Sequence, residues 1–236
     1  MFWIAGLGWA MGLAAVEPPP RVFRSGPAAV PLLELFTSEG CSSCPPAERW
    51  LGERRTEEGL WRDFVPVAWH VTYWDRLGWP DRFADKANTA RQYAYARVWR
   101  SAQVYTPCFV RGGAEWRVGQ RAEVGTAVGE LVAVVNPDTD SVQVRFATME
   151  DGSVHVARLG GGIVSEVRAG ENRGRRLEHE FVLLATATAP LREGAAVVRL
   201  PAIPDDITVS RDALAVWISR GDDPRPVQAT GGWLVE

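Results

Sequence analysis

Short apolar runs and longer amphipathic stretches follow one another in the first half of the chain. The apolar runs have the length and composition of buried strands, and the stretches between them are long enough for helices. The predicted strands are residues 32–36, 64–71 and 104–111, and the predicted helices are residues 41–55, 85–99 and 121–135. Asp85 stands where a helix N-cap is expected. This order of strands and helices predicts an α/β half.

The pattern changes after Asn136-Pro137-Asp138. From there apolar and polar residues alternate with a period of two, and Gly and Pro separate the alternating runs. These runs are residues 142–146, 154–156, 163–167, 180–187, 196–200 and 213–219. Such alternation is typical of antiparallel strands. We therefore predict one domain at residues 28–135 and a second, mostly antiparallel β domain at residues 136–236, which makes the chain α+β overall.

The N-terminus has the character of an export signal. Residues 1–16 carry no charge and are mostly apolar, and Glu17-Pro18-Pro19-Pro20 ends the run. This apolar run has the length of a signal-peptide core and is too short for a membrane span. We predict that residues 1–27 are a signal-peptide-like segment and linker, and that the protein is periplasmic or secreted. A buried N-terminal helix is the alternative.

Composition narrows the range of partners. The chain has 236 residues, 46% of them hydrophobic, and a formal net charge of −3 without a basic block. This balance predicts a globular protein that does not bind nucleic acid and has no stable membrane span after processing. Its three cysteines are too few for a disulfide-rich scaffold and favour a local pair.

The pair is Cys41 and Cys44, which form a C-x-x-C motif between a predicted strand and a predicted helix. At a helix N-terminus the free backbone N–H groups and the helix dipole favour a thiolate. Cys41 is therefore the predicted attacking thiol, and Cys44 is the predicted resolving thiol. Ser42 and Ser43 are small and polar, so we expect the pair to be accessible.

Thr106-Pro107 is the second part of the predicted catalytic site. In thioredoxin-like folds a cis proline begins a strand and lies across from the C-x-x-C motif. Pro107 follows Cys44 by 63 positions, with one predicted strand and one predicted helix between them, as that fold requires. The predicted fold of residues 28–135 is therefore thioredoxin-like.

Other interpretations of the cysteines stay open. A zinc site would need two further ligands from Cys108, His70, His155 and His179. Copper(I) could be held by three thiols if Cys108 joins the pair. A permanent structural disulfide is also common in exported proteins. Cys108 alone is interpreted as a buried apolar residue, and no metal ligand or cofactor is assigned from the sequence.

An aromatic loop follows the second predicted strand. His70, Tyr73, Trp74 and Asp75 are its candidate substrate-binding residues, with His70 or Asp75 as a proton acceptor for the resolving thiol. The alternative is a packed loop that covers the sheet edge. His155 and His179 are predicted to be surface histidines, and residues 170–176 to be a solvated turn, with an anion-binding loop as the alternative.

Taken together, these segments resemble a bacterial protein family, domain of unknown function 1223. The resemblance rests on Leu33-Glu34-Leu35-Phe36-Thr37-Ser38-Glu39-Gly40-Cys41-Ser42-Ser43-Cys44-Pro45-Pro46-Ala47, His70-Val71-Thr72-Tyr73-Trp74-Asp75, Leu77-Gly78-Trp79, Phe83-Ala84, Arg91-Gln92, Tyr105-Thr106-Pro107 and Gly170-Glu171-Asn172-Arg173-Gly174-Arg175. It implies a thioredoxin-like, secreted protein with a β-rich C-terminal part, and it implies no substrate. The sequence departs from the family at Cys108, where a polar residue is expected.

The resulting hypothesis is a thiol–disulfide oxidoreductase that acts through Cys41 and Cys44 on protein or small-molecule thiols and disulfides. The alternative is a binding protein, either redox-inert or specific for copper(I). Whether the pair oxidises, reduces or isomerises depends on its reduction potential.

Overall fold

The computed structural model describes residues 19–121, 125–136 and 139–235. Most of the predicted signal-like segment lies outside these ranges, whereas Arg21–Arg24, predicted to be linker, form strand β1. No helix in the described ranges is long and apolar enough to cross a membrane.

Strands dominate the described chain. They are β1 (Arg21–Arg24), β2 (Leu32–Thr37), β3 (Val65–His70), β4 (Cys108–Arg111), β5 (Ala114–Trp116), β6 (Val132–Asn136), β7 (Ser141–Arg145), β8 (Gly152–Gly161), β9 (Ile163–Glu166), β10 (Arg176–His179), β11 (Val182–Leu191), β12 (Ala195–Arg199), β13 (Arg211–Ser219) and β14 (Pro226–Val235). The helices are α1 (Pro45–Glu53) and α2 (Lys86–Trp99), with short 3-10 turns η1 (Arg54–Thr56) and η2 (Thr72–Leu77).

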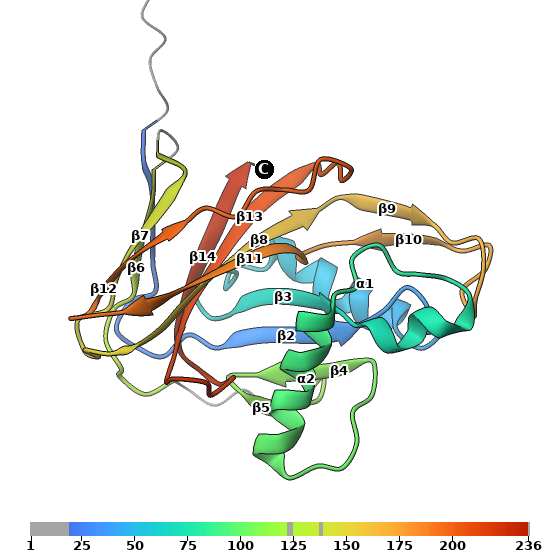
Figure 1. Ribbon diagram of the computed structural model, residues 1–236, viewed down its shortest axis with the longest axis horizontal. Helices are drawn as coiled ribbons and strands as arrows, with labels where there is room; N and C mark the ends of the chain where they lie inside the picture. The colour runs from blue at the N-terminus through green and yellow to red at the C-terminus, as the bar shows by residue number, and fades with distance from the viewer. Residues whose placement is uncertain (1–18, 122–124, 137–138, 236) are drawn as a thin grey trace, which may run out of the picture.

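One mixed sheet joins both halves of the chain (Figure 1). Its eight strands have the order β14-β13-β8-β11-β3-β2-β4-β5. Strand β11 pairs in parallel with β3 at Val182 and Ala68, and β2 also runs parallel to β3. The neighbours further out are antiparallel. The predicted fold class is therefore wrong. The protein is mostly β, and its first half is not an α/β thioredoxin-like domain but part of a large mixed sheet with helices α1 and α2.

Apolar side chains on the two faces of this sheet explain its packing. Leu33 and Leu35 of β2 pack with Leu51 of α1 on one face. Leu32 and Phe36 point the other way and pack with Tyr95 of α2. Because successive strand residues alternate between faces, the apolar residues before and after Glu34 bury both sides of β2.

A second sheet is antiparallel and has four strands in the order β1-β6-β7-β12. It packs against the β13 side of the eight-stranded sheet (Figure 1). Val142 and Val144 of β7 pack there against Val216 and Ile218 of β13. The helix predicted at residues 121–135 is not found in the described part of that segment, where β6 begins at Val132. The division of the chain near residue 136 stays a prediction.

Strands β9 and β10 form a separate antiparallel hairpin, and β10 lies against α1 (Figure 1). The loop between them, residues 167–175, is called the cover loop below. Val167 and Arg175 close it by a backbone hydrogen bond of 3.0 Å. The hairpin therefore brings residues of the second half of the chain to the C-x-x-C motif of the first.

Candidate functional site

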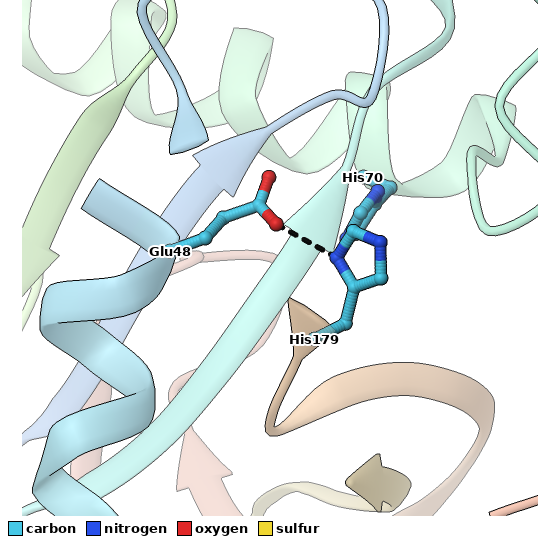
Figure 2. Close-up of side chains that lie close together, drawn as sticks. All are labelled: Glu48, His70 and His179. Atoms are coloured by element: carbon cyan, nitrogen blue, oxygen red, sulfur yellow. Dashed lines mark hydrogen bonds and ion pairs between the residues drawn. The ribbon is translucent and has the colours of Figure 1, made fainter. Parts of the chain in front are cut away.

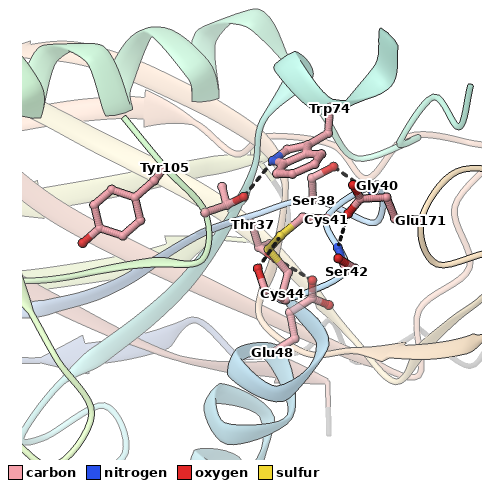
Figure 3. The surroundings of a disulfide bond; sticks show 12 residues. Thr37, Ser38, Gly40, Cys41, Ser42, Cys44, Glu48, Trp74, Tyr105 and Glu171 are labelled. Atoms are coloured by element: carbon pink, nitrogen blue, oxygen red, sulfur yellow. Dashed lines mark hydrogen bonds between the residues drawn. A yellow bond between two sulfur atoms is a disulfide. The ribbon is translucent and has the colours of Figure 1, made fainter. Parts of the chain in front are cut away.

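Cys41 and Cys44 are joined by a disulfide where β2 leads into α1 (Figure 3). Their Cα atoms are 5.4 Å apart. Cys44 is the N-cap residue of α1, so the helix begins at Pro45 and not at Cys41 as predicted. The reason is that Pro45 and Pro46 lack backbone N–H groups and fit the first positions of a helix, where these groups have no partner.

Both cysteines are buried, with 0% of each residue exposed. Ser42 and Ser43 between them are exposed, and the Ser43 hydroxyl lies 3.3 Å from Cys41 Sγ. The expectation of an accessible pair is therefore wrong for this conformation. Small polar residues between the cysteines therefore do not decide the exposure of the cysteines themselves.

The cover loop holds the backbone around Cys41. Asn172, which is 0% exposed, donates from Nδ2 to the carbonyl oxygens of Glu39 and Cys41 at 2.8 and 2.9 Å. The Ser42 backbone N–H donates to Glu171 Oε2 at 3.1 Å, and hydrogen bonds from Ser42 lower the pKa of Glu171. The segment predicted to be a solvated turn thus contacts the disulfide loop through Glu171 and Asn172.

Trp74 connects the disulfide loop with Thr106. Its indole N–H donates to Thr106 Oγ1 at 2.7 Å. Its Cβ atom lies 3.0 Å from where a side chain on Gly40 would begin, so a larger residue than glycine at position 40 would require Trp74 to shift slightly. Trp74 therefore lies beside Gly40, the residue before Cys41, and reaches Thr106, as Figure 3 shows.

Pro107 lies next to the end of β2. It directly precedes β4, in which Cys108 pairs with Phe36 of β2. The Thr106–Pro107 peptide bond is cis, as the sequence predicted. The predicted catalytic residues Thr106 and Pro107 thus lie at the end of β2 from which the cysteine loop begins.

Tyr73 and Asp75 stabilise the aromatic loop. The Tyr73 hydroxyl donates to Gln92 at 3.2 Å, and Gln92 donates to the Tyr105 carbonyl at 2.8 Å. Burial raises the pKa of Tyr73 to about 12. Asp75 accepts from the backbone N–H of Asp81 at 3.2 Å, and burial raises the pKa of Asp75.

His70 lies in the interior, with 1% of the residue exposed. Its Nδ1 atom is 2.6 Å from Asp81 Oδ2, and the same oxygen accepts from the Glu39 backbone N–H at 2.8 Å. Burial opposes a charge on His70, but Asp81 and Glu48 outweigh it and raise the pKa of His70. His70 is thereby linked through Asp81 to the segment that leads into Cys41.

Sequence reasoning missed a second buried histidine. His179 is predicted to be at the surface, but it is 1% exposed and lies between the carboxylates of Glu39 and Glu48. Figure 2 shows its contact with Glu48. Its Nδ1 atom is 2.7 Å from Glu48 Oε2, and its Nε2 atom is 3.1 Å from Glu39 Oε1. The period-two pattern of β10, in which Leu177 and His179 are both buried, is the signal that places His179 inside.

The charges of this group depend on one another. Burial opposes a charge on His179, but Glu48 and Glu39 outweigh it and raise the pKa of His179 to about 10. Burial alone would raise the pKa of Glu39, but hydrogen bonds from His179, Ser165 and Trp79 lower it to about 2. Thr37 donates to the other oxygen of Glu48 at 2.6 Å. At neutral pH His179 is therefore a cation between two carboxylates.

The family of the chain follows from a match over most of its length. The model of a family described as "Protein of unknown function (DUF1223)" matches residues 32–219, a range that includes both cysteines and the cover loop. The chain belongs to the DUF1223 family. No curated protein matches it.

Two solved structures resemble this DUF1223 protein. Protein AGR_C_4864 from Agrobacterium tumefaciens, known from an X-ray crystal structure, is 26% identical, with a TM-score of 0.63 over 88% of this chain and 95% of that one. HBP35 of Porphyromonas gingivalis is 12% identical, with a TM-score of 0.57 over 88% of this chain and 76% of that one. The second likeness concerns the fold alone.

Proposed function

We propose that this DUF1223 protein carries out thiol–disulfide exchange through Cys41 and Cys44. The observation that carries the proposal is the Cys41–Cys44 disulfide at the N-terminus of α1, with Cys44 as the N-cap residue. Pro45 and Pro46 provide no N–H groups here, but the dipole of α1 favours a thiolate at this position and so lowers the cost of breaking the S–S bond.

The exchange takes place in two steps. A substrate thiolate attacks Cys41 Sγ, forms a mixed disulfide with Cys41 and releases Cys44 as a thiolate beside the helix N-terminus. A second substrate thiolate then attacks the substrate sulfur of the mixed disulfide, so that the substrate leaves as a disulfide and Cys41 leaves as a thiolate. The two electrons of the substrate thiols end on Cys41 and Cys44, so these steps oxidise the substrate. The same steps in reverse reduce a substrate disulfide.

Burial imposes a condition on this reaction. Both cysteines are 0% exposed, and Asn172 holds the backbone on either side of Gly40. Exchange therefore requires that the cover loop moves away from Cys41. Burial is also the observation that favours the rival function, a permanent structural disulfide in a binding protein.

The reduction potential separates the two functions. The protein is equilibrated across a glutathione or dithiothreitol redox series, its thiols are trapped by alkylation, and the oxidised fraction is measured by mass spectrometry. Cys108→Ser is the background for every sample, so that each alkylated thiol belongs to the pair. A reversible two-electron transition between about −270 and −120 mV, the range of known dithiol oxidoreductases, supports exchange. A pair that stays oxidised below about −300 mV supports the structural disulfide.

We also propose that the protein acts in the periplasm or outside the cell on protein or small-molecule thiols and disulfides. A disulfide persists in these oxidising compartments, whereas cytosolic thiols are kept reduced. Cell fractionation, followed by N-terminal sequencing of the mature protein, tests the location. A mature chain that begins within residues 17–27 supports export, and an uncleaved chain in the cytosol contradicts it.

A further inference from the structure

We propose that Glu48, His70 and His179 bind a divalent transition-metal ion. The three side chains come from α1, β3 and β10, and one ligand atom of each lies within 4.8 Å of the others (Figure 2). Within the described ranges, these are the three residues of His, Cys, Asp or Glu type that lie close enough together to hold a metal ion. No cysteine belongs to the group. The site is therefore independent of the disulfide chemistry proposed above.

The donor set suits such an ion. Two imidazole nitrogens and one carboxylate oxygen are the protein ligands of several catalytic zinc sites, which keep a fourth position open. Glu48 is 8% exposed, and the two histidines are 1% exposed each. The site is thus shielded from water by the large sheet, by α1 and by the hairpin of β9 and β10.

His70 has the arrangement of a metal-binding histidine. Its Nδ1 atom is 2.6 Å from Asp81 Oδ2, whereas its buried Nε2 atom has no hydrogen-bond partner. Metal-binding histidines commonly donate one ring N–H to a carboxylate and coordinate the ion through the other nitrogen. A buried polar atom without a partner costs free energy, and a bound ion would remove that cost at Nε2.

The charge around the site favours a cation. Three buried carboxylates, those of Glu39, Glu48 and Asp81, contact two imidazoles at distances of 2.6–3.1 Å. His179 Nδ1 lies 2.7 Å from Glu48 Oε2. Two ligands of a tetrahedral zinc ion lie about 3.3 Å apart, because each Zn–N or Zn–O bond is about 2.0–2.1 Å long. Both atoms can therefore coordinate one ion when this pair opens by about 0.6 Å.

Metal titration of the oxidised, disulfide-bonded protein tests the proposal. The protein is first dialysed against EDTA, and Zn²⁺ is then added in competition with a chromophoric chelator. We expect one equivalent of Zn²⁺ to bind, and Co²⁺ to give visible d–d absorption at the same stoichiometry. A folded wild-type protein that binds neither ion above the level of the chelator blank overturns the proposal.

Substitution of a proposed ligand tests the assignment. In His70→Asn the amide can still donate to Asp81, but the Nε2 ligand is lost, so we expect the affinity for Zn²⁺ to fall about tenfold or more. The matched control is His155→Gln, a histidine remote from the site, which should bind as wild type. Circular dichroism checks that each variant is folded, and Glu48→Gln replaces His70→Asn if that variant is unfolded.

A double variant separates this site from the cysteines. Cys41→Ser with Cys44→Ser should bind Zn²⁺ as the wild type does. Loss of binding in the double variant together with full binding in His70→Asn would place the ion on the thiols and overturn the proposal. Because none of these titrations measures exchange, failure of the metal site leaves the disulfide proposal unaffected.

Discussion

Asn172 connects the cover loop to the disulfide loop through its buried side chain. It donates two hydrogen bonds to buried carbonyl oxygens, those of Glu39 and Cys41. Asn172→Ala removes the donor to the Glu39 carbonyl oxygen and leaves the Cys41 carbonyl oxygen with only the Cys44 backbone N–H, at 3.2 Å, so we expect the free energy of unfolding to fall by about 1–3 kcal/mol. The disulfide should also be reduced faster by dithiothreitol, because the loop is held less firmly. Urea denaturation and timed alkylation measure the two effects.

Arg173→Ala is the matched control for this prediction. Arg173 is the next residue of the cover loop and is exposed, so its loss should leave both quantities near the wild-type values. Equal reduction rates in Asn172→Ala and Arg173→Ala would show that Asn172 does not limit access to Cys41.

Cys108 should be inert as long as the protein is folded. It is 2% exposed, and burial raises the pKa of its thiol to about 11. At pH 8 only about one thiol in a thousand is then ionised, and the thiolate is the reactive form. We expect iodoacetamide to leave Cys108 unmodified in the native protein and to modify it in urea, as read by mass spectrometry. Labelling at the same rate in both states would contradict its place in the core.

At the scale of elements, the start of α2 allows a direct test of a predicted cap. Asp85 Oδ1 accepts from the Ala87 backbone N–H at 2.6 Å, which confirms the predicted N-cap. Asp85→Ala removes this acceptor, so the free energy of unfolding should fall by about 1 kcal/mol. Asp85→Asn keeps an acceptor and should lose only a few tenths of that amount. Urea denaturation of the wild type and of the two variants measures these differences. Equal losses of unfolding free energy in both variants would contradict a capping role for Asp85.

Elements with a clear periodicity could be predicted, and those without one could not. The sequence located β2, β3 and α2 to within a residue or two at either end. Residues 121–135 were assigned to a helix, although Gly125 and Gly129 lie within them. Val132 to Val135 are equally compatible with a buried helix or strand by composition. Pairing of β6 with β1 and β7 decides for the strand, and sequence periodicity does not contain that information.

At the scale of the whole molecule, contacts between distant segments set the fold class and much of the site. Alternation predicts which face of a strand is buried, but not which strand lies beside it, so the pairing of β11 with β3 could not be foreseen. The same holds for the site: His179 reaches Glu48 across 131 residues of sequence. Cys41, Cys44 and Thr106-Pro107 could be found from the sequence because each is a local motif.

His155 makes the stability of the whole protein depend on pH. Its ring stacks on Trp217 at 4.9 Å, its Nε2 atom lies 2.8 Å from Ser219 Oγ, and burial and Arg91 lower its pKa to about 4 from 6.5. Because the pKa is lower in the folded state, the contribution of His155 is complete above pH 6.5 and is lost as the pH falls towards 4. The shift corresponds to at most about 3 kcal/mol.

The difference between two pH profiles isolates this contribution. His155→Gln keeps a group that can bond to Ser219 but does not titrate. The free energy of unfolding of the wild type should therefore fall more steeply than that of His155→Gln between pH 6.5 and 4. His70 and His179 have raised pKa values and change the free energy of unfolding in the opposite direction. Because both proteins contain them, their contributions cancel in the difference between the two profiles. Urea denaturation with EDTA throughout gives the two profiles, and parallel profiles would mean that His155 can be protonated without loss of its packing on Trp217.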